Sequence, residues 1–244
     1  MKISLLCPSR ERLNKFLTFT SSIFCTAKNI KNIEIVLGVD EDDPKFKEYK
    51  RIANNLSFIK FITFKEGLFK EEGLSGLWNI MARKCTGDIV AMVGDDMIFQ
   101  TNDWDKKIID TFQAQEDPIW LIHCNDGMRG PGNKYENVEP MAVNSFVHRA
   151  YINAVGRYVQ TEEPAIFQDT YLDRLFNGLG RKIYYHNIMI KHLHFSEGGT
   201  KDKTSEVLEA TRVGIWDNEN LFHEKLSTVM QREIKILKDQ YKIK

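Results

Sequence analysis

The strongest constraint on the fold is a regular alternation of short apolar strands with amphipathic helices over about the first hundred residues. Strands are predicted at 2–8, 33–44, 57–64 and 87–99, and helices at 10–27, 45–55 and 73–87. The second strand pattern ends in an acidic turn before Pro44. Strands that alternate with helices favour a parallel sheet covered on both faces. We therefore predict an α/β fold with a mainly parallel sheet flanked by helices.

The second half of the chain is less regular. Helices are predicted at 103–115, 149–156 and 167–180, strands at 119–124, 141–148 and 181–190, and a Gly/Pro-rich loop at 125–140. In the tail 221–244, apolar residues recur at the spacing of one helical face: Leu226, Met230, Ile234, Leu237 and Tyr241. Because no stretch has the composition of a linker, we expect residues 1–244 to form a single domain with a C-terminal helix.

Composition excludes several classes of protein. Lys plus Arg and Asp plus Glu balance at 34 each, so no overall field points to nucleic acid or to an anionic membrane. The four cysteines form no CxxC pair, which argues against a zinc knuckle or a disulfide framework. No apolar run approaches the roughly 20 residues that span a bilayer. We expect a soluble, cytoplasmic protein without an integral membrane segment.

Polar residues follow all four predicted strands of the first half. They are Pro8, Ser9 and Arg10 after the first strand, Asp40 after the second, Lys65 and Glu66 after the third, and Asp95 and Asp96 after the fourth. In an open parallel sheet, ligands bind outside the carboxyl ends of the strands. Each group alone is also consistent with a solvated turn, but their joint occurrence on one edge predicts a binding site.

Asp95 and Asp96 place two like charges at the end of the most buried strand. Unit charges ~4 Å apart repel by roughly 4 kcal/mol at an effective dielectric of about 20. Protonating one carboxylate or placing a cation between them relieves the repulsion. Carboxylate oxygens suit Mg²⁺ or Mn²⁺. A metal site is therefore predicted here, with a pair of solvated turn aspartates as the alternative.

Two further groups are candidates for the same site. His192 and His194 alternate in a strand pattern and share a face. One imidazole that completes a carboxylate shell favours Mn²⁺ over Mg²⁺, whereas the plainer interpretation is an exposed strand end. Asp169 begins a predicted helix, where the dipole alone favours a carboxylate; its functional interpretation is a general base for an attacking hydroxyl.

Four segments together resemble the family 2 glycosyltransferases of the GT-A, Rossmann-like, fold. In chain order they are "ISLLCPSRERLNKF", "EIVLGVDEDD", "GLWNIMARKCTGDIVAMVGDDMIF" and "AVGRYVQTEEPAIFQDTYLDRLFNGLG". The similarity covers roughly residues 2–200 and is strongest over 74–99. It implies a nucleotide-binding half at 1–100, an acceptor and catalytic half at 101–200, and a closing loop with the C-terminal helix at 201–244.

The resemblance also implies roles for individual residues. Asp96 would be the direct metal ligand, with His192 or His194 completing the site, and Asp169 would be the catalytic base. The predicted nucleotide-sugar contacts are Pro8, Ser9, Arg10, Asp40, Asn79, Arg83 and Asp95. Three positions depart from the family pattern: Gly94 replaces the first aspartate of Asp-X-Asp, Gln168 replaces a glutamate, and Trp78 stands where many relatives have arginine.

The function that follows is a metal-dependent transfer of a sugar from a nucleotide-diphosphate donor, with a UDP-sugar favoured, to an acceptor hydroxyl. Lys201 and Lys203 could add positive charge over the diphosphate, the loop 125–140 would shape the acceptor site, and the family implies inversion. The acceptor is left open between a polysaccharide, a protein and a modified base of phage DNA, in a bacterial or phage-infected cell.

Other functions fit parts of the pattern. A non-catalytic nucleotide-sugar-binding module and a sugar nucleotidylyltransferase remain alternatives, although no Gly-rich phosphate loop with a following lysine lies near the first strand. A polymerase palm also uses Gly-Asp-Asp, but there the motif lies in an antiparallel hairpin. The lysine-rich face of the C-terminal helix is typical of a solvated surface, with contact to DNA or lipid phosphates as the alternative.

Overall fold

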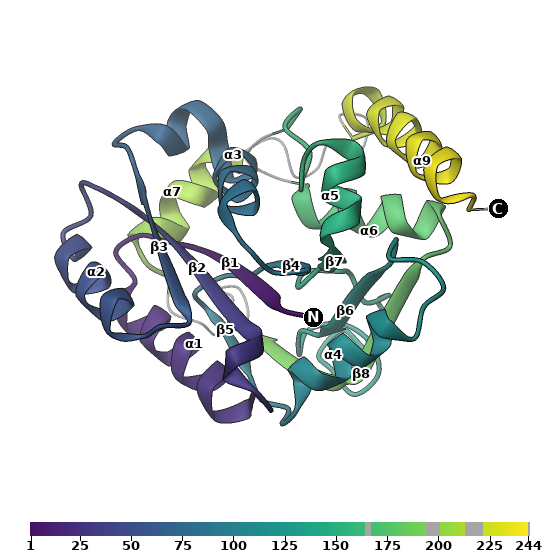
Figure 1. Cartoon of the computed structure of the whole chain (residues 1–244). Coiled ribbons are helices and arrows are strands. Elements are labelled where there is room, and N and C mark those ends of the chain that lie inside the picture. Colours follow the sequence, from purple (N-terminus) through teal and green to yellow (C-terminus); the bar gives the residue numbers. More distant parts are fainter. Residues whose placement is uncertain (164–166, 194–200, 213–221, 244) are drawn as a thin grey trace.

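The computed structural model of the chain describes residues 1–163, 167–193, 201–212 and 222–243. The strands are β1 (Ile3–Ser9), β2 (Ile33–Asp40), β3 (Ile59–Phe64), β4 (Ile89–Met92), β5 (Met97–Phe99), β6 (Leu121–Asn125), β7 (Phe146–His148) and β8 (Lys182–His192). Within the described residues they form one eight-stranded sheet in the order β3-β2-β1-β4-β7-β6-β8-β5. Figure 1 shows this curved sheet between two layers of helices.

The helices account for most of the remaining regular structure. They are α1 (Leu13–Thr26), α2 (Phe46–Asn55), α3 (Leu68–Lys84), α4 (Trp104–Gln113), α5 (Arg149–Val155), α6 (Gln168–Gly178), α7 (Lys203–Arg212) and α9 (Ser227–Tyr241). A short 3₁₀ turn, η1 (Ile30–Asn32), precedes β2, and a π-helical turn, η3 (Phe222–Leu226), precedes α9. No helix among the described segments has the length and apolarity needed to cross a bilayer.

The first four strands in the sheet order, β3, β2, β1 and β4, are all parallel. Every residue of β2 and β4 is buried, as expected for strands that are covered on both faces. Ile3 of β1 is paired with Ile33 on one side and with Ile89 on the other. Because the strands run in register and in one direction, their carboxyl ends meet at one edge, which confirms the predicted α/β fold.

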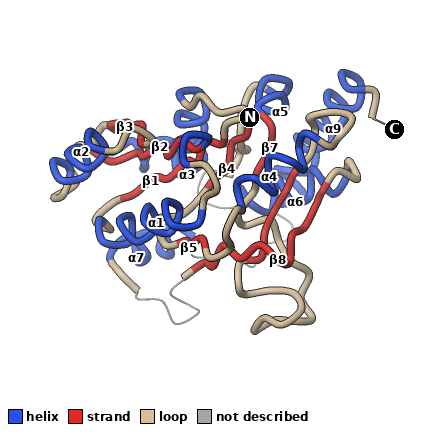
Figure 2. Tube along the Cα trace, turned by 60° about the horizontal axis from the view of Figure 1, so that its bottom comes forward, coloured by secondary structure: helices blue, strands red, loops and turns tan. Residues whose placement is uncertain are grey.

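The other half of the sheet is mixed. β7 is antiparallel to both β4 and β6, whereas β8 is parallel to β6 and antiparallel to β5. β8 is eleven residues long and pairs first with β6 and then, through its last residues, with β5. Figure 2 shows β8 extending beneath the helices toward β5. This length carries His192 to the edge where the parallel strands end, opposite Met97.

Three differences from the sequence predictions concern segments near the strand ends. The stretch 87–99 is two strands, β4 and β5, separated by the turn that holds Asp95 and Asp96. The stretch 201–212, expected as part of a closing loop, contains the helix α7. Helix α3 starts at Leu68 rather than at Gly73 and is interrupted at Gly73, where φ is 61°; this positive angle lies in a region that glycine adopts without the steric cost of a Cβ.

Two apolar clusters lie on opposite faces of the sheet. Alternate residues of β1 enter different clusters, Leu5 on one side and Leu6 on the other, because successive side chains of a strand point to opposite faces. The Leu6 cluster includes residues of α3, α5, α6 and α9, and the Leu5 cluster includes residues of α1 and α4. Leu226, Ile234 and Leu237 are buried in the former, which confirms the apolar face predicted for the C-terminal helix.

A buried acid also attaches α9 to the rest of the molecule. Glu233 is 2% exposed, accepts a hydrogen bond from the Tyr171 hydroxyl at 2.7 Å, and is bonded to Nε of Arg157 at 2.9 Å. Burial raises the pKa of Glu233, and the charge of Arg157 opposes this shift without cancelling it. Glu233 has therefore lost much of its hydration, and the hydrogen bonds from Arg157 and Tyr171 compensate for that loss.

Truncating this acid should loosen the C-terminal helix. Replacing Glu233 with Ala leaves Arg157 without its buried partner, and we expect the free energy of unfolding to fall by about 3 kcal/mol. Urea denaturation followed by circular dichroism would measure it. Lys235→Ala, at an exposed position of the same helix, should leave the unfolding midpoint unchanged; equal effects of the two variants would contradict the assignment.

Candidate active site

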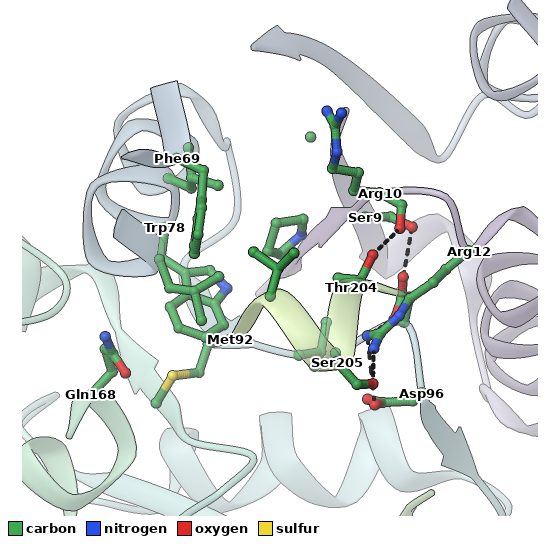
Figure 3. Close-up of a pocket in the computed structure, with 18 of the residues that line it drawn as sticks. Ser9, Arg10, Arg12, Phe69, Trp78, Met92, Asp96, Gln168, Thr204 and Ser205 are labelled. Carbon is green, nitrogen blue, oxygen red and sulfur yellow. Dashed lines mark hydrogen bonds and ion pairs between the residues drawn. The ribbon is translucent and has the colours of Figure 1, made fainter. Parts of the chain in front are cut away.

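A cavity of about 1210 Å³ opens at the edge where the parallel strands end. One end is polar and is formed by the residues after β1, β2 and β4 together with α7; the other is apolar and is formed largely by α3 and the segments near α6. Figure 3 shows Arg12, Asp96 and Ser205 toward one end and Phe69, Trp78 and Met92 toward the other. A cavity with this division can hold a polar ligand and a less polar one side by side.

Asp95 lies in the turn after β4 and is 2% exposed. Its carboxylate accepts a hydrogen bond from Oγ of Ser9 at 2.6 Å and one from Nη1 of Arg12 at 3.2 Å. Burial raises the pKa of Asp95 to about 6; the charge of Arg12 opposes the shift, and the neighbouring Asp96 adds to it. Asp95 is among the residues that line the cavity, and its carboxylate holds Ser9 and Arg12 in place.

Asp96 is placed differently and pairs with His192. Nε2 of His192 lies 3.4 Å from Oδ1 of Asp96, because the backbone N–H of Leu193 donates to the Asp96 carbonyl and aligns the two segments. Burial opposes ionisation of Asp96, but the hydrogen bond and charge of His192, with the charges of Arg12 and Lys15, outweigh it and lower the pKa. Burial likewise opposes protonation of His192, and Asp96 outweighs it and raises the pKa.

These two side chains fit a divalent ion. A carboxylate and an imidazole that both line the cavity are ligands for Mn²⁺ and related ions. Among the described residues, no group of three or more His, Cys, Asp and Glu side chains could enclose a metal unaided. The remaining positions would fall to the ligand and water, as in metal sites that act on phosphates. His194, the other predicted ligand, lies outside the described residues.

Arg12 is a residue of the candidate site that sequence reasoning missed. Its guanidinium lies between the carboxylate of Asp95, at 3.2 Å, and that of Asp96, at 3.9 Å, and its side chain is 10% exposed. Burial opposes the charge of Arg12, but Asp202, Asp95 and Asp96 outweigh it and raise the pKa. The cation that the carboxylate pair demands is thus supplied, at least in part, by the chain itself.

The predicted nucleotide contacts after β1 and β2 are brought together. Pro8, Ser9, Arg10 and Asp40 all line the cavity. Nη1 of Arg10 donates to Asp40 at 2.9 Å, and both terminal nitrogens of Arg10 donate to Asp42, at 2.6 and 2.8 Å. Burial raises the pKa of Asp40, and Arg10 opposes the shift. The result is a charged wall in which the hydrogen-bonding groups are already oriented.

Two residues of α3 are placed elsewhere. Asn79 is 5% exposed and bonds to the backbone of Tyr158 and Val159, accepting at 2.8 and 3.2 Å and donating at 3.0 Å. Arg83 is exposed, and neither side chain is among those that line the cavity. Their placement does not support the predicted contact with the donor. Leu77 and Trp78 present α3 to the cavity instead.

Of the remaining predicted residues, some line the cavity and others do not. Asp169 and Gln168, at the start of α6, line the cavity, and Oδ1 of Asp169 accepts the backbone N–H of Thr170 at 2.7 Å. Lys203 also lines the cavity and lies 3.6 Å from Glu11. Lys201 is outside the lining and is paired with Glu209. Of the loop 125–140, Met128 and Arg129 reach the cavity.

The arrangement of the sheet and its helices is that of the GT-A fold, which solved structures of glycosyltransferases share. The mannosyltransferase PcManGT of Pyrobaculum calidifontis, in complex with GDP-Man and Mn²⁺, matches with a TM-score of 0.62 and 13% identity over 96% of this chain and 69% of its own. TarS of S. aureus in complex with UDP-GlcNAc matches with a TM-score of 0.58 and 12% identity over 98% and 80%. Neither a protein-family profile nor a curated protein sequence matches the chain.

The raised pKa of Asp95 predicts how stability depends on pH without metal. Folded Asp95 keeps its proton up to about pH 6, whereas the unfolded chain loses it near pH 4, so stability falls as pH rises through this window. Asp95→Asn removes the effect and keeps an acceptor for Ser9. Relative to the unaltered protein in EDTA, the variant should gain roughly 2 kcal/mol of unfolding free energy between pH 4 and pH 7.

Denaturant titrations at several pH values would measure this gain. A difference between the two proteins that stays constant across the range would contradict the assigned titration.

Proposed function

We propose that the protein is a metal-dependent glycosyltransferase that moves a sugar from a nucleotide-diphosphate donor to an acceptor hydroxyl with inversion. The observation that carries the proposal is the Asp96–His192 pair, which faces a large cavity at the carboxyl edge of the parallel strands. Its support comes from the GT-A fold and from structural neighbours that bind GDP-Man with Mn²⁺ or UDP-GlcNAc.

The donor belongs at the polar end of the cavity. Pro8, Ser9, Arg10 and Asp40 would contact the nucleoside, because their side chains line the wall formed by the ends of β1 and β2. Asp96 and His192 would hold a divalent ion, which when bound supplies Lewis-acid stabilisation of the leaving diphosphate. Lys203, also on the wall, would add positive charge there. A UDP-sugar is the favoured donor.

Asp169 is the proposed general base. It lies in the first turn of α6 and lines the same cavity as His192, and its charge contributes to the raised pKa of His192. A carboxylate next to the metal site can take the proton of an acceptor hydroxyl that attacks the sugar from the side opposite the diphosphate, which inverts the anomeric centre. The acceptor would then enter past Met128, Arg129 and Phe167.

A donor screen tests the proposal. The protein is incubated with Mn²⁺ and single UDP- or GDP-sugars, and release of the nucleoside diphosphate is measured. Slow hydrolysis of one donor without acceptor is the expected result. Tight binding of a donor with no release under any condition would instead favour a non-catalytic nucleotide-sugar-binding module, and release of pyrophosphate from a nucleoside triphosphate and a sugar phosphate would favour a nucleotidylyltransferase.

Removing the carboxylate that faces His192 should abolish turnover. Asp96→Ala deletes one of two protein ligands, so we expect donor hydrolysis to fall at least 100-fold and Mn²⁺ binding, followed by electron paramagnetic resonance, to weaken in parallel. Asp110→Ala on the exposed face of α4 is the matched control. An Asp96→Ala protein that retains hydrolysis and Mn²⁺ affinity would refute the metal site.

Asp169→Asn separates chemistry from donor binding. The amide keeps the oxygen that accepts the Thr170 N–H but cannot act as a base, so turnover with acceptor should drop about 10²–10⁴-fold while the donor Kd changes less than about twofold. Steady-state kinetics and calorimetry measure the two quantities. An equal loss of both would contradict the role of base and indicate a donor contact.

A further inference from the structure

Next to Asp95 and Asp96, the side chain of Asp202 contacts two further charged side chains, Arg12 and Lys15. Asp202, just before α7, accepts hydrogen bonds from Nε and Nη2 of Arg12 at 2.9 and 2.7 Å and from Nζ of Lys15 at 2.6 Å. Burial opposes ionisation of Asp202, but Arg12, Lys15 and the backbone N–H of Ser205 outweigh it and lower the pKa well below its usual range. The carboxylate of Asp202 therefore lies between two cations, Arg12 and Lys15, at the start of α1.

The contact fixes α7 to the cavity wall. Asp202 caps this helix by accepting the backbone N–H of Ser205 at 2.9 Å, and Oγ of Ser205 accepts Nη2 of Arg12 at 2.6 Å. Oγ1 of Thr204 donates to the carbonyl of Arg10 at 2.8 Å. Figure 3 shows Thr204 and Ser205 beside Arg10 and Arg12 at the polar end of the cavity. The first turn of α7 is thus hydrogen-bonded to the residues that follow β1.

Arg12 also faces the proposed metal site, and Lys15 shares Asp202 with it. Nη1 of Arg12 points to Asp95 and Asp96, while the other two nitrogens of the same guanidinium hold Asp202. Lys15 is near enough for its charge to lower the pKa of Asp96. A diphosphate that approaches a metal at Asp96 would therefore meet Arg12 and Lys15 next. Arginine and lysine are the side chains that bind phosphate oxygens, and a carboxylate presents the same paired oxygens to a guanidinium.

We propose that Arg12 and Lys15 form the diphosphate subsite of the donor cavity, and that Asp202 occupies this subsite as an internal anion until a donor displaces it. The inference rests on the proposed function, because it needs a diphosphate ligand. A diphosphate diester carries two negative charges where Asp202 carries one, so the exchange favours the ligand. The apparent Kd is then the intrinsic Kd divided by the fraction of molecules in which Asp202 has released the two cations.

The distinguishing consequence is a gain of affinity when an acidic residue is neutralised. Asp202→Asn keeps an oxygen that can cap α7 but removes the competing charge, so UDP, GDP and inorganic pyrophosphate should bind with a Kd roughly fivefold lower. Lys15→Gln should raise the Kd by about the same factor. Isothermal titration calorimetry, in Mn²⁺ and again in EDTA, measures all four proteins: unaltered, both variants and a control.

Asp117→Asn is the matched control. Asp117 also pairs with an arginine, Arg181 at 3.2 Å, and accepts a backbone N–H two residues later in the chain. Its partner Arg181 is not among the residues that line the cavity, whereas Arg12, the partner of Asp202, is. Its Kd should equal that of the unaltered protein. An unchanged or higher Kd for Asp202→Asn, or an unchanged Kd for Lys15→Gln, would overturn the inference. The proposed function would still stand in that case, provided that the unaltered protein binds the nucleotides. Absence of binding in all four proteins would overturn both.

Discussion

The compensation of the carboxylates of Asp95 and Asp96 by Arg12 is the interaction on which the polar end of the cavity depends. Asp95 and Asp96 lie in the turn after β4; Asp95 is 2% exposed and the side chain of Asp96 is 13% exposed, so both carboxylates have lost most of their hydration. The guanidinium of Arg12 reaches both and also holds Asp202. One side chain thus links the end of β1, the turn after β4 and the start of α7, so the geometry of three distant segments is set by the same charge.

The two aspartates do different work although they are adjacent. Asp95 turns inward to Ser9 and Arg12, and its pKa is raised; Asp96 turns to His192, and its pKa is lowered. Two neighbouring carboxyl groups with opposite shifts are a recurrent sign of divided roles at a functional site. Here the division follows from position: consecutive residues in the turn present their side chains to different walls.

The fold and much of the polar wall could be predicted from local patterns. The apolar runs that became β1, β2 and β3 and the helical spacing of α1, α2 and α9 are short-range signals, and the rule that parallel strands end at one edge places Ser9, Arg10 and Asp40 together. The predictions for Asn79 and Arg83 rested on family resemblance alone. In the structure Asn79 bonds to the backbone of Tyr158 and Val159, because the face of α3 that meets the cavity is the one carrying Leu77 and Trp78.

The sequence by itself determined most of the strands and helices of the first half, the adjacent carboxylates at a strand end and the repulsion that a cation would relieve, because hydrophobic periodicity and like-charge repulsion act between residues close in the chain. Which cation answers that need was decided by the tertiary structure. Arg12 meets Asp95 across 83 residues and Asp202 across 190, and His192 meets Asp96 only because β8 is long enough to pair with β5. Contacts of this separation leave no periodic signal, since they arise when the sheet brings its strand ends to one edge.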